Sequence, residues 1–138
     1  DLATGAVTLT EVSGLPGGIV ANPPVVDQGR GIVVAYDSGN GVVVALRTAD
    51  LSELWRAELD HGSHPLLFAD TGELLLGHHD LAAGEHVVVV DIETGRELGR
   101  AATGSPVQSV LFPAAGFAND AYLVSFTTLT RVSVATAG

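Results

Sequence analysis

The sequence predicts an all-β protein built from a repeated antiparallel sheet, on the basis of short apolar runs, turn residues between them and an internal repeat. The runs cover residues 32–36, 42–46, 73–76, 86–90 and 122–126. Between them lie stretches rich in Gly, Asn and Asp at 38–41, 70–72, 94–95 and 116–120, and the chain holds 17 glycines. Short strands separated by such turns at even spacing are typical of antiparallel all-β folds.

The internal repeat gives the size of the repeating unit. Residues 45–55, ALRTADLSELW, align with 89–99, VVDIETGRELG, and residues 1–5, DLATG, match 91–95, DIETG. Asp1, Arg47 and Asp91 are therefore equivalent, 46 and 44 residues apart, and a fainter copy at 132–138 places Val134 a further 43 residues on. Periods in the mid-forties suit four short strands, the size of one β-propeller blade. We predict an all-β β-propeller unit of three four-stranded antiparallel blades, half or part of a ring.

Counting strands from the ring centre outward places each element in order. Residues 6–12 form an outer strand, two complete four-stranded sets span 24–59 and 65–100, and the end supplies three inner strands at 108–112, 121–127 and 131–135. The chain is thus predicted to be a single unit, with blades at approximately 13–59, 60–102 and 103–138, the last completed by the outer strand within 1–12.

Three blades are too few for a closed ring, because propellers contain about four to eight. An open wedge would expose a blade face at each end and unpaired strand edges. Two solutions stand: two copies form a six-bladed ring as a homodimer, or the chain is part of a longer propeller. The homodimer is the simpler of the two.

The repeat resembles two known propeller families. An Asp-x-x-Thr-Gly turn and a strand bearing Leu54 and Trp55 are similar to the repeat of pyrroloquinoline-quinone-type (quinoprotein-like) propellers. Residues 65–68, 70–73 and 87–91 resemble the YVTN-type surface and periplasmic propellers. Both resemblances imply the propeller fold and favour a periplasmic or extracellular location, and the choice between the families stays open.

The first resemblance assigns Trp55 as a blade-docking residue, whereas Gly99 and Leu9 stand near that position in the other copies. It does not extend to the quinone cofactor. That family typically holds the quinone with an adjacent cysteine pair and a stacking tryptophan, while this chain has no cysteine and one tryptophan. Quinone-dependent dehydrogenation is disfavoured.

Composition excludes several partners. The 138 residues include 6 Lys and Arg against 16 Asp and Glu, a net charge of −10, which disfavours nucleic acid and anionic membranes. No apolar run approaches the length of a membrane span. The chain begins at Asp1 and contains no methionine, so we expect a processed chain or a fragment.

One cluster of residues suggests chemistry. All five histidines fall in the middle blade, His61 and His64 in the connection before it and His78, His79 and His86 around its second hairpin. A turn at residues 71–72 would set His64 opposite His79, and a loop over residues 80–85 would set His79 opposite His86. Directly opposed side chains share one face of a sheet, with Cβ atoms about 5 Å apart.

Three imidazoles in such a row suit Zn²⁺, and two carboxylates lie near enough to serve as a further ligand or to orient one. The candidate metal residues are therefore His64, His79 and His86, with His61, His78, Asp60 and Asp80. The alternative is a polar, exposed histidine-rich rim, since a register slip of one residue would send His79 to the opposite face.

Two functions remain. The first is a non-catalytic scaffold or binding module that holds a ligand or partner at the face where these loops emerge. The second is a zinc-binding propeller, hydrolytic if three histidines leave a coordination position open for water. The sequence contains no catalytic signature strong enough to name a reaction, so the first is preferred.

Overall fold

The computed structural model describes residues 4–5, 16–17, 23–37, 39–59, 65–104, 111–113, 119–124 and 128–135. Their regular structure consists entirely of β-strands, which form three antiparallel sheets in which each strand pairs with its sequence neighbours. The first sheet contains β1 (Val25–Asp27), β2 (Ile32–Asp37), β3 (Val42–Arg47) and β4 (Glu53–Glu58). The second contains β5 (Leu66–Phe68), β6 (Glu73–Asp80), β7 (Gly84–Asp91) and β8 (Glu97–Ala102). The third contains β9 (Leu111–Pro113), β10 (Asp120–Val124) and β11 (Leu129–Ser133).

The all-β antiparallel prediction is confirmed, and the strands fall within a few residues of the expected ranges. The predicted outer strand at 6–12 lies outside the described residues. Within the described segments, no helix is long and apolar enough to cross a membrane.

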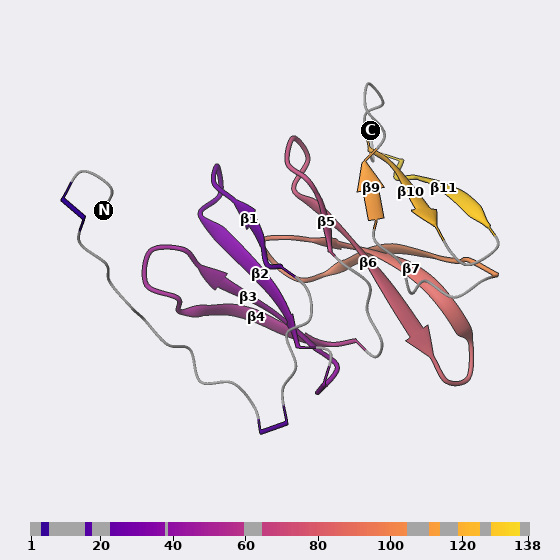
Figure 1. Cartoon of the computed structure of the whole chain (residues 1–138), viewed down its shortest axis with the longest axis horizontal. Coiled ribbons are helices and arrows are strands. Elements are labelled where there is room, and N and C mark those ends of the chain that lie inside the picture. Colours follow the sequence, from indigo (N-terminus) through magenta and orange to yellow (C-terminus); the bar gives the residue numbers. More distant parts are fainter. Residues whose placement is uncertain are drawn as a thin grey trace.

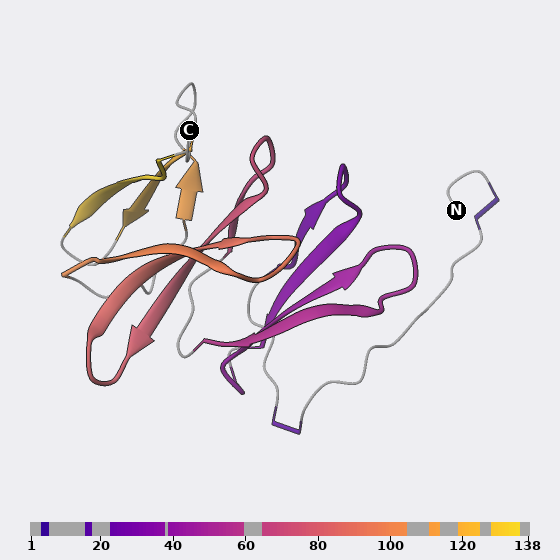
Figure 2. The same cartoon turned by 180° about the vertical axis from the view of Figure 1, so that it is seen from behind.

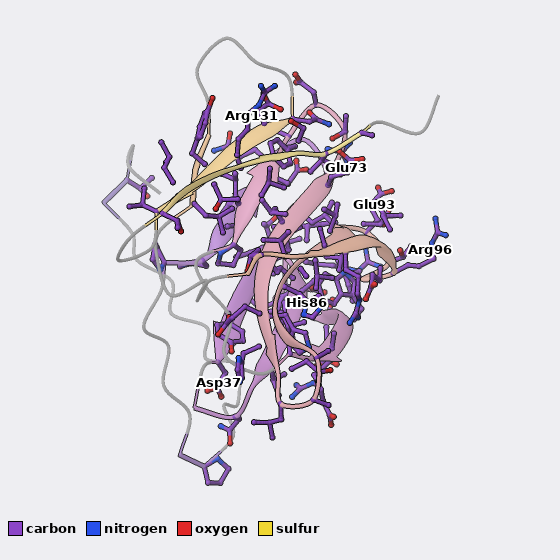
Figure 3. The ribbon with its side chains drawn as sticks, turned by 90° about the vertical axis from the view of Figure 1, so that its right-hand side faces the viewer. Asp37, Glu73, His86, Glu93, Arg96 and Arg131 are labelled. Atoms are coloured by element: carbon purple, nitrogen blue, oxygen red, sulfur yellow. The ribbon has the colours of Figure 1, made fainter. Side chains whose placement is uncertain are left out.

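The three sheets follow one another across the molecule in chain order (Figures 1 and 2). Their first strands form a row, because β1 contacts β5 and β5 contacts β9. Figure 3 shows the two ends of the strands: Glu73 and Glu93 lie toward one, Asp37 and His86 toward the other. We call the end of Asp37 and His86 the histidine rim.

The distribution of buried and exposed side chains along the strands explains why the sheets stack. In β2 every second side chain is buried, as expected for a strand with one face against a neighbour. In β6, Leu74, Leu75 and Leu76 are all buried, so both faces of the second sheet are covered. Leu74 and Leu76 join the core shared with the first sheet, and Leu75 joins a second core with Ala121 and Leu123 of the third.

The backbone repeats in all three sheets. Each sheet has a residue with positive φ before its second strand, and the carbonyl of that residue accepts an N–H from the chain just beyond the third strand. The three donor–acceptor pairs, each 2.9 Å apart, are Thr48 to Gly31, Ile92 to Gly72 and Val134 to Asn119. The four-stranded sheets also share a register shift between their third and fourth strands, at Ala45/Leu46 and Val89/Val90.

This repeat corrects one alignment. Arg47, Asp91 and Ser133 occupy the same ladder position, opposite Ile32, Glu73 and Asp120 respectively. Ser133, and not Val134, is therefore the equivalent of Asp91, so the last spacing is 133 minus 91, or 42 residues. The expected alignment was wrong by one residue because sequence identity had faded in the last copy.

Two side chains join the first sheet to the second. The indole Nε1–H of Trp55 in β4 donates to the carbonyl of Ile92 at 2.8 Å, and its ring lies against Gly95 in the β7–β8 turn. Arg30, in the β1–β2 turn, donates to the carbonyl of Ala69 at 2.8 Å and forms an ion pair with Asp27 at the same distance. The expectation that Trp55 docks one sheet on the next is confirmed.

Candidate functional site

A pocket of about 300 Å³ opens on the histidine rim between the first and second sheets. Its lining comes from three places: the β2–β3 turn, the end of β4, and β6. The lining residues are Asn40, Gly41, Glu58, Leu59 and His78. This is the face where the sequence predicted that the second hairpins and the sheet-to-sheet connections emerge together.

The first-sheet wall of the pocket is held by its own hydrogen bonds. One carboxylate oxygen of Asp37 accepts the backbone N–H groups of Gly39 and Asn40, which closes the β2–β3 turn. The N–H of Leu59 donates to the Gly41 carbonyl at 2.7 Å. The buried hydroxyl of Tyr36 donates to the Leu59 carbonyl at 3.0 Å. The turn and the end of β4 therefore form one rigid wall.

The second-sheet wall carries a histidine pair. His78 in β6 lies directly opposite His86 in β7. Both follow the alternation of Leu76 and Val88, so they share the face turned toward the first sheet. Nδ1 of His86 lies 3.0 Å from the Gly84 carbonyl oxygen. Because a carbonyl can only accept, Nδ1 carries the proton, and Nε2 of a neutral His86 keeps its lone pair.

Asp80 is at the tip of the same hairpin. Its carboxylate accepts the N–H of Ala82 at 2.7 Å and that of Ala83 at 2.9 Å. These two hydrogen bonds lower the pKa of Asp80 below its usual value, and the bond from Ala83 has the larger effect. The nearby His78 and His86 lower the pKa further. Asp80 thus stabilises the turn and adds negative charge beside the histidine pair.

His79 lies on the opposite face of the second sheet. It stands opposite Glu85, and its Nδ1 lies 2.9 Å from a Glu85 carboxylate oxygen. Its neighbour along this face is Gly77, opposite Val87, which belongs to the core shared with the third sheet. His79 and His86 therefore cannot converge on one ion from a single face.

The expected pairing of His79 with His86 is wrong by one residue. Asp80 pairs with Gly84, so three residues connect the strands in place of the longer loop expected, and Gly84 takes a φ of 82°. A three-residue hairpin with glycine in the left-handed region is a common tight connection. The shorter turn shifts every residue pair between β6 and β7 by one residue.

The expected pairing of His64 with His79 needs a register that the first hairpin of the second sheet does not have. It would set Leu66 opposite Gly77, whereas Leu66 lies opposite Leu75. Asp60, His61 and His64 themselves lie outside the described residues.

Among the residues that the structure describes, no group of three or more His, Asp or Glu side chains is arranged to hold a metal ion. Of the seven candidates, His78, His86 and Asp80 are brought to one rim, and His79 is separated from them. The zinc site remains a prediction.

Sequence reasoning missed Asn40 and Glu58 as pocket residues. The order of the strands could have predicted them. In antiparallel sheets of this topology, the Asn40-Gly41 turn and the end of β4 lie at the same end of the strands as the β6–β7 turn.

Comparison with known proteins finds neither a family model nor a curated protein that matches the chain.

Proposed function

We propose that the chain is a set of three β-propeller blades that completes a six-bladed ring with a second copy and acts as a non-catalytic binding scaffold. Three sheets with the same backbone repeat, stacked in chain order with their first strands in a row, support the blade assignment. Trp55 joins neighbouring sheets in the manner expected of a blade-docking residue.

The observation that carries ring completion is the contrast between the middle sheet and the outer two. The second sheet has both faces covered, whereas each outer sheet has at least one exposed large apolar side chain on the face turned away from it, although Val42 and Leu46 on that face of the first sheet are buried. In the third sheet Val124 and Leu129 are paired on that face and are 44% and 69% exposed. In the first sheet Val26 is 49% exposed on the corresponding face.

Exposed apolar faces of this kind need cover. A second copy supplies it symmetrically, since the third sheet of each chain packs on the first sheet of the other and both junctions are the same. Within the described residues β11 pairs with β10, and in the proposed ring the outer strand of the second copy joins the other edge of β11.

The binding role belongs to the histidine rim. Its 300 Å³ pocket lies between two sheets and carries Glu58, Asn40 and His78 on a largely rigid frame. Carboxylate, amide and imidazole groups can bind a polar or cationic small ligand through hydrogen bonds.

Solution mass tests the proposal. We expect the wild-type chain to have twice the mass of one 14.1 kDa chain in light scattering at micromolar concentration. Leu129→Asp places a charge on the outward face of the third sheet and should shift the mass toward the monomer. Leu81→Asp is the matched control, because Leu81 is 90% exposed in the β6–β7 turn and lies away from that face. A soluble wild-type monomer, or equal behaviour of the two variants, contradicts the homodimer.

A further inference from the structure

The two junctions between sheets are equivalent, but only one is filled by an indole. At the first junction Trp55 lies opposite Ala45, its Nε1–H is bonded to the Ile92 carbonyl, and its ring packs against the core. At the second junction Gly99 lies opposite Val89 in the same ladder position.

The surroundings of the two positions correspond closely. Trp55 stands in Glu-Leu-Trp-Arg-Ala and Gly99 in Glu-Leu-Gly-Arg-Ala. In both strands the arginine forms an ion pair with the glutamate three residues before it, Arg56 with Glu53 and Arg100 with Glu97. The counterpart of Ile92 at the second junction is Val134, because the N–H groups of both bond to equivalent carbonyls.

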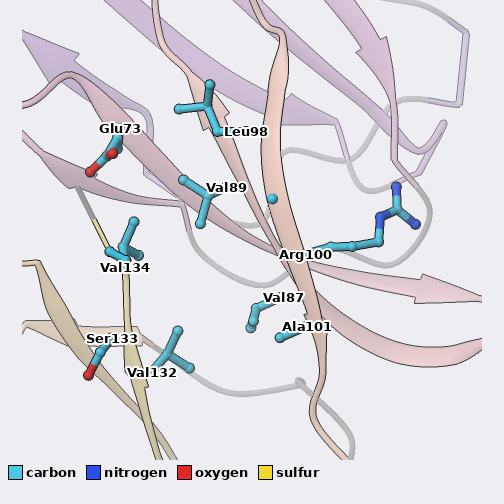
Figure 4. A pocket seen from close by; sticks show the side chains of 11 residues that line it. Glu73, Val87, Val89, Leu98, Arg100, Ala101, Val132, Ser133 and Val134 are labelled. Atoms are coloured by element: carbon cyan, nitrogen blue, oxygen red, sulfur yellow. The ribbon is translucent and has the colours of Figure 1, made fainter. Parts of the chain in front are cut away.

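A cavity of about 270 Å³, partly open to solvent, occupies the second junction. Its apolar lining includes Val87, Val89 and Leu98 from the second sheet and Val132 and Val134 from the third (Figure 4). A Cβ atom added to Gly99 would meet nothing within 4 Å. An apolar cavity of about 150 Å³ can bind benzene, so this one has room for a two-ring aromatic.

The charged and polar groups around the cavity favour a ligand that donates a hydrogen bond. Glu73 lines it, and one of its carboxylate oxygens already accepts bonds from Asn119 and Thr71. Arg100 also lines it, but Figure 4 shows its side chain directed away from the other labelled residues, and its guanidinium is paired with Glu97. The remaining polar groups are the Glu73 carboxylate, the Ser133 hydroxyl and the backbone of the third sheet, and each of them can accept a hydrogen bond.

We propose that this cavity is a binding site for a flat, two-ring aromatic ligand that carries an N–H donor and no negative charge, with indole as its simplest member. The ring occupies the space that Trp55 fills at the first junction. Its N–H donates toward the Val134 carbonyl, as Trp55 does to the carbonyl of Ile92. All the residues that line the cavity belong to one chain.

Indole itself is the probe. We expect it to bind the wild-type chain with a dissociation constant on the order of 0.1–1 mM, the range for a small aromatic of this size. In methyl-resolved NMR the shifts should fall on Val87, Val89 and Val132, while Val34 and Val43 at the filled junction stay unchanged. Benzothiophene, which has the same shape without the N–H, should bind several-fold more weakly.

Gly99→Trp is the matching variant. It should abolish indole binding and raise the melting temperature by roughly 3–8 °C, because a built-in ring fills the same space. Gly99→Ala is the control and should retain binding. The proposal is overturned if indole fails to bind wild type at several millimolar, or if its shifts map elsewhere. Should Gly99→Trp not fold, the wild-type shifts alone decide.

Discussion

The indole ring of Trp55 lies against Gly95 so closely that a Cβ atom on that glycine would come within 2.6 Å of the ring. Gly95 also has a backbone φ of 69°, which residues other than glycine rarely adopt. The two residues are 40 positions apart, one in β4 and one in the β7–β8 turn, and together they join the first sheet to the second.

Removing the ring should therefore weaken the junction as a whole. We expect Trp55→Ala to lower the free energy of unfolding by about 3–5 kcal/mol, as for other large-to-small changes at packed aromatic sites. Trp55→Phe keeps most of the packing but leaves the Ile92 carbonyl without its donor, and should cost about 1–3 kcal/mol. Urea denaturation measures both. If Trp55→Ala lowers the free energy of unfolding by less than about 1 kcal/mol, the packing of Trp55 does not stabilise the junction between the sheets.

Gly95→Ala should lower the free energy of unfolding by about 2–4 kcal/mol, for two reasons. The added Cβ atom would clash with the Trp55 ring, and alanine is strained at this positive φ. The double variant Trp55→Ala with Gly95→Ala separates them, because the steric part disappears with the ring and the φ part remains. We expect the effects to be less than additive by at least 1 kcal/mol. Strict additivity would show that the ring and the glycine do not interact. Gly104→Ala, which also has a positive φ but nothing within 4 Å of its added Cβ, is the control for φ alone.

Sequence periodicity was sufficient for the strands, whereas the docking role of Trp55 was an expectation from the resemblance of the repeat to a known family. Runs such as residues 32–36 alternate or are wholly apolar in the way that β-strands require, and Gly, Asn and Asp mark their ends. The register of His79 was not within reach of this reasoning. It depends on the backbone bonds that Asp80 accepts and on the left-handed Gly84, which together shorten one turn. A shift of one residue in this turn decides whether His86 shares a face of the sheet with His78 or with His79.

The Asp27–Arg30 pair should make stability depend on pH. Asp27 is only 4% exposed, and burial acts to raise the pKa of its carboxyl. The hydrogen bonds and charge of Arg30 outweigh that effect, so the pKa lies below the ordinary value of 3.8. A carboxyl with a lowered pKa stabilises the fold fully above its unfolded value and loses this contribution as the pH falls through the folded value.

We therefore expect the wild-type free energy of unfolding to fall as the pH drops below 3.8, and Asp27→Asn to remove part of that fall. At pH 7 the variant should be less stable by about 1–3 kcal/mol, because Arg30 loses the partner that aims it at Ala69. Denaturation curves from pH 7 to acid measure both effects. Asp70→Asn, at an exposed turn position, is the control and should change neither. Parallel pH curves for wild type and Asp27→Asn would contradict the assignment.

The separation of the histidines onto two faces sharpens the zinc prediction. His78 and His86 face the first sheet with Asp80 nearby, and the Nδ1 proton of His86 leaves Nε2 available as a ligand atom. His79 faces the third sheet and is engaged with Glu85. Any zinc held at the histidine rim should therefore depend on His78 and His86 and not on His79. Zinc content after dialysis should fall at least tenfold in His86→Ala and stay at the wild-type level in His79→Ala. Equal losses in the two variants would place the ion elsewhere, and a wild-type chain without stoichiometric zinc would leave the rim as a metal-free binding face.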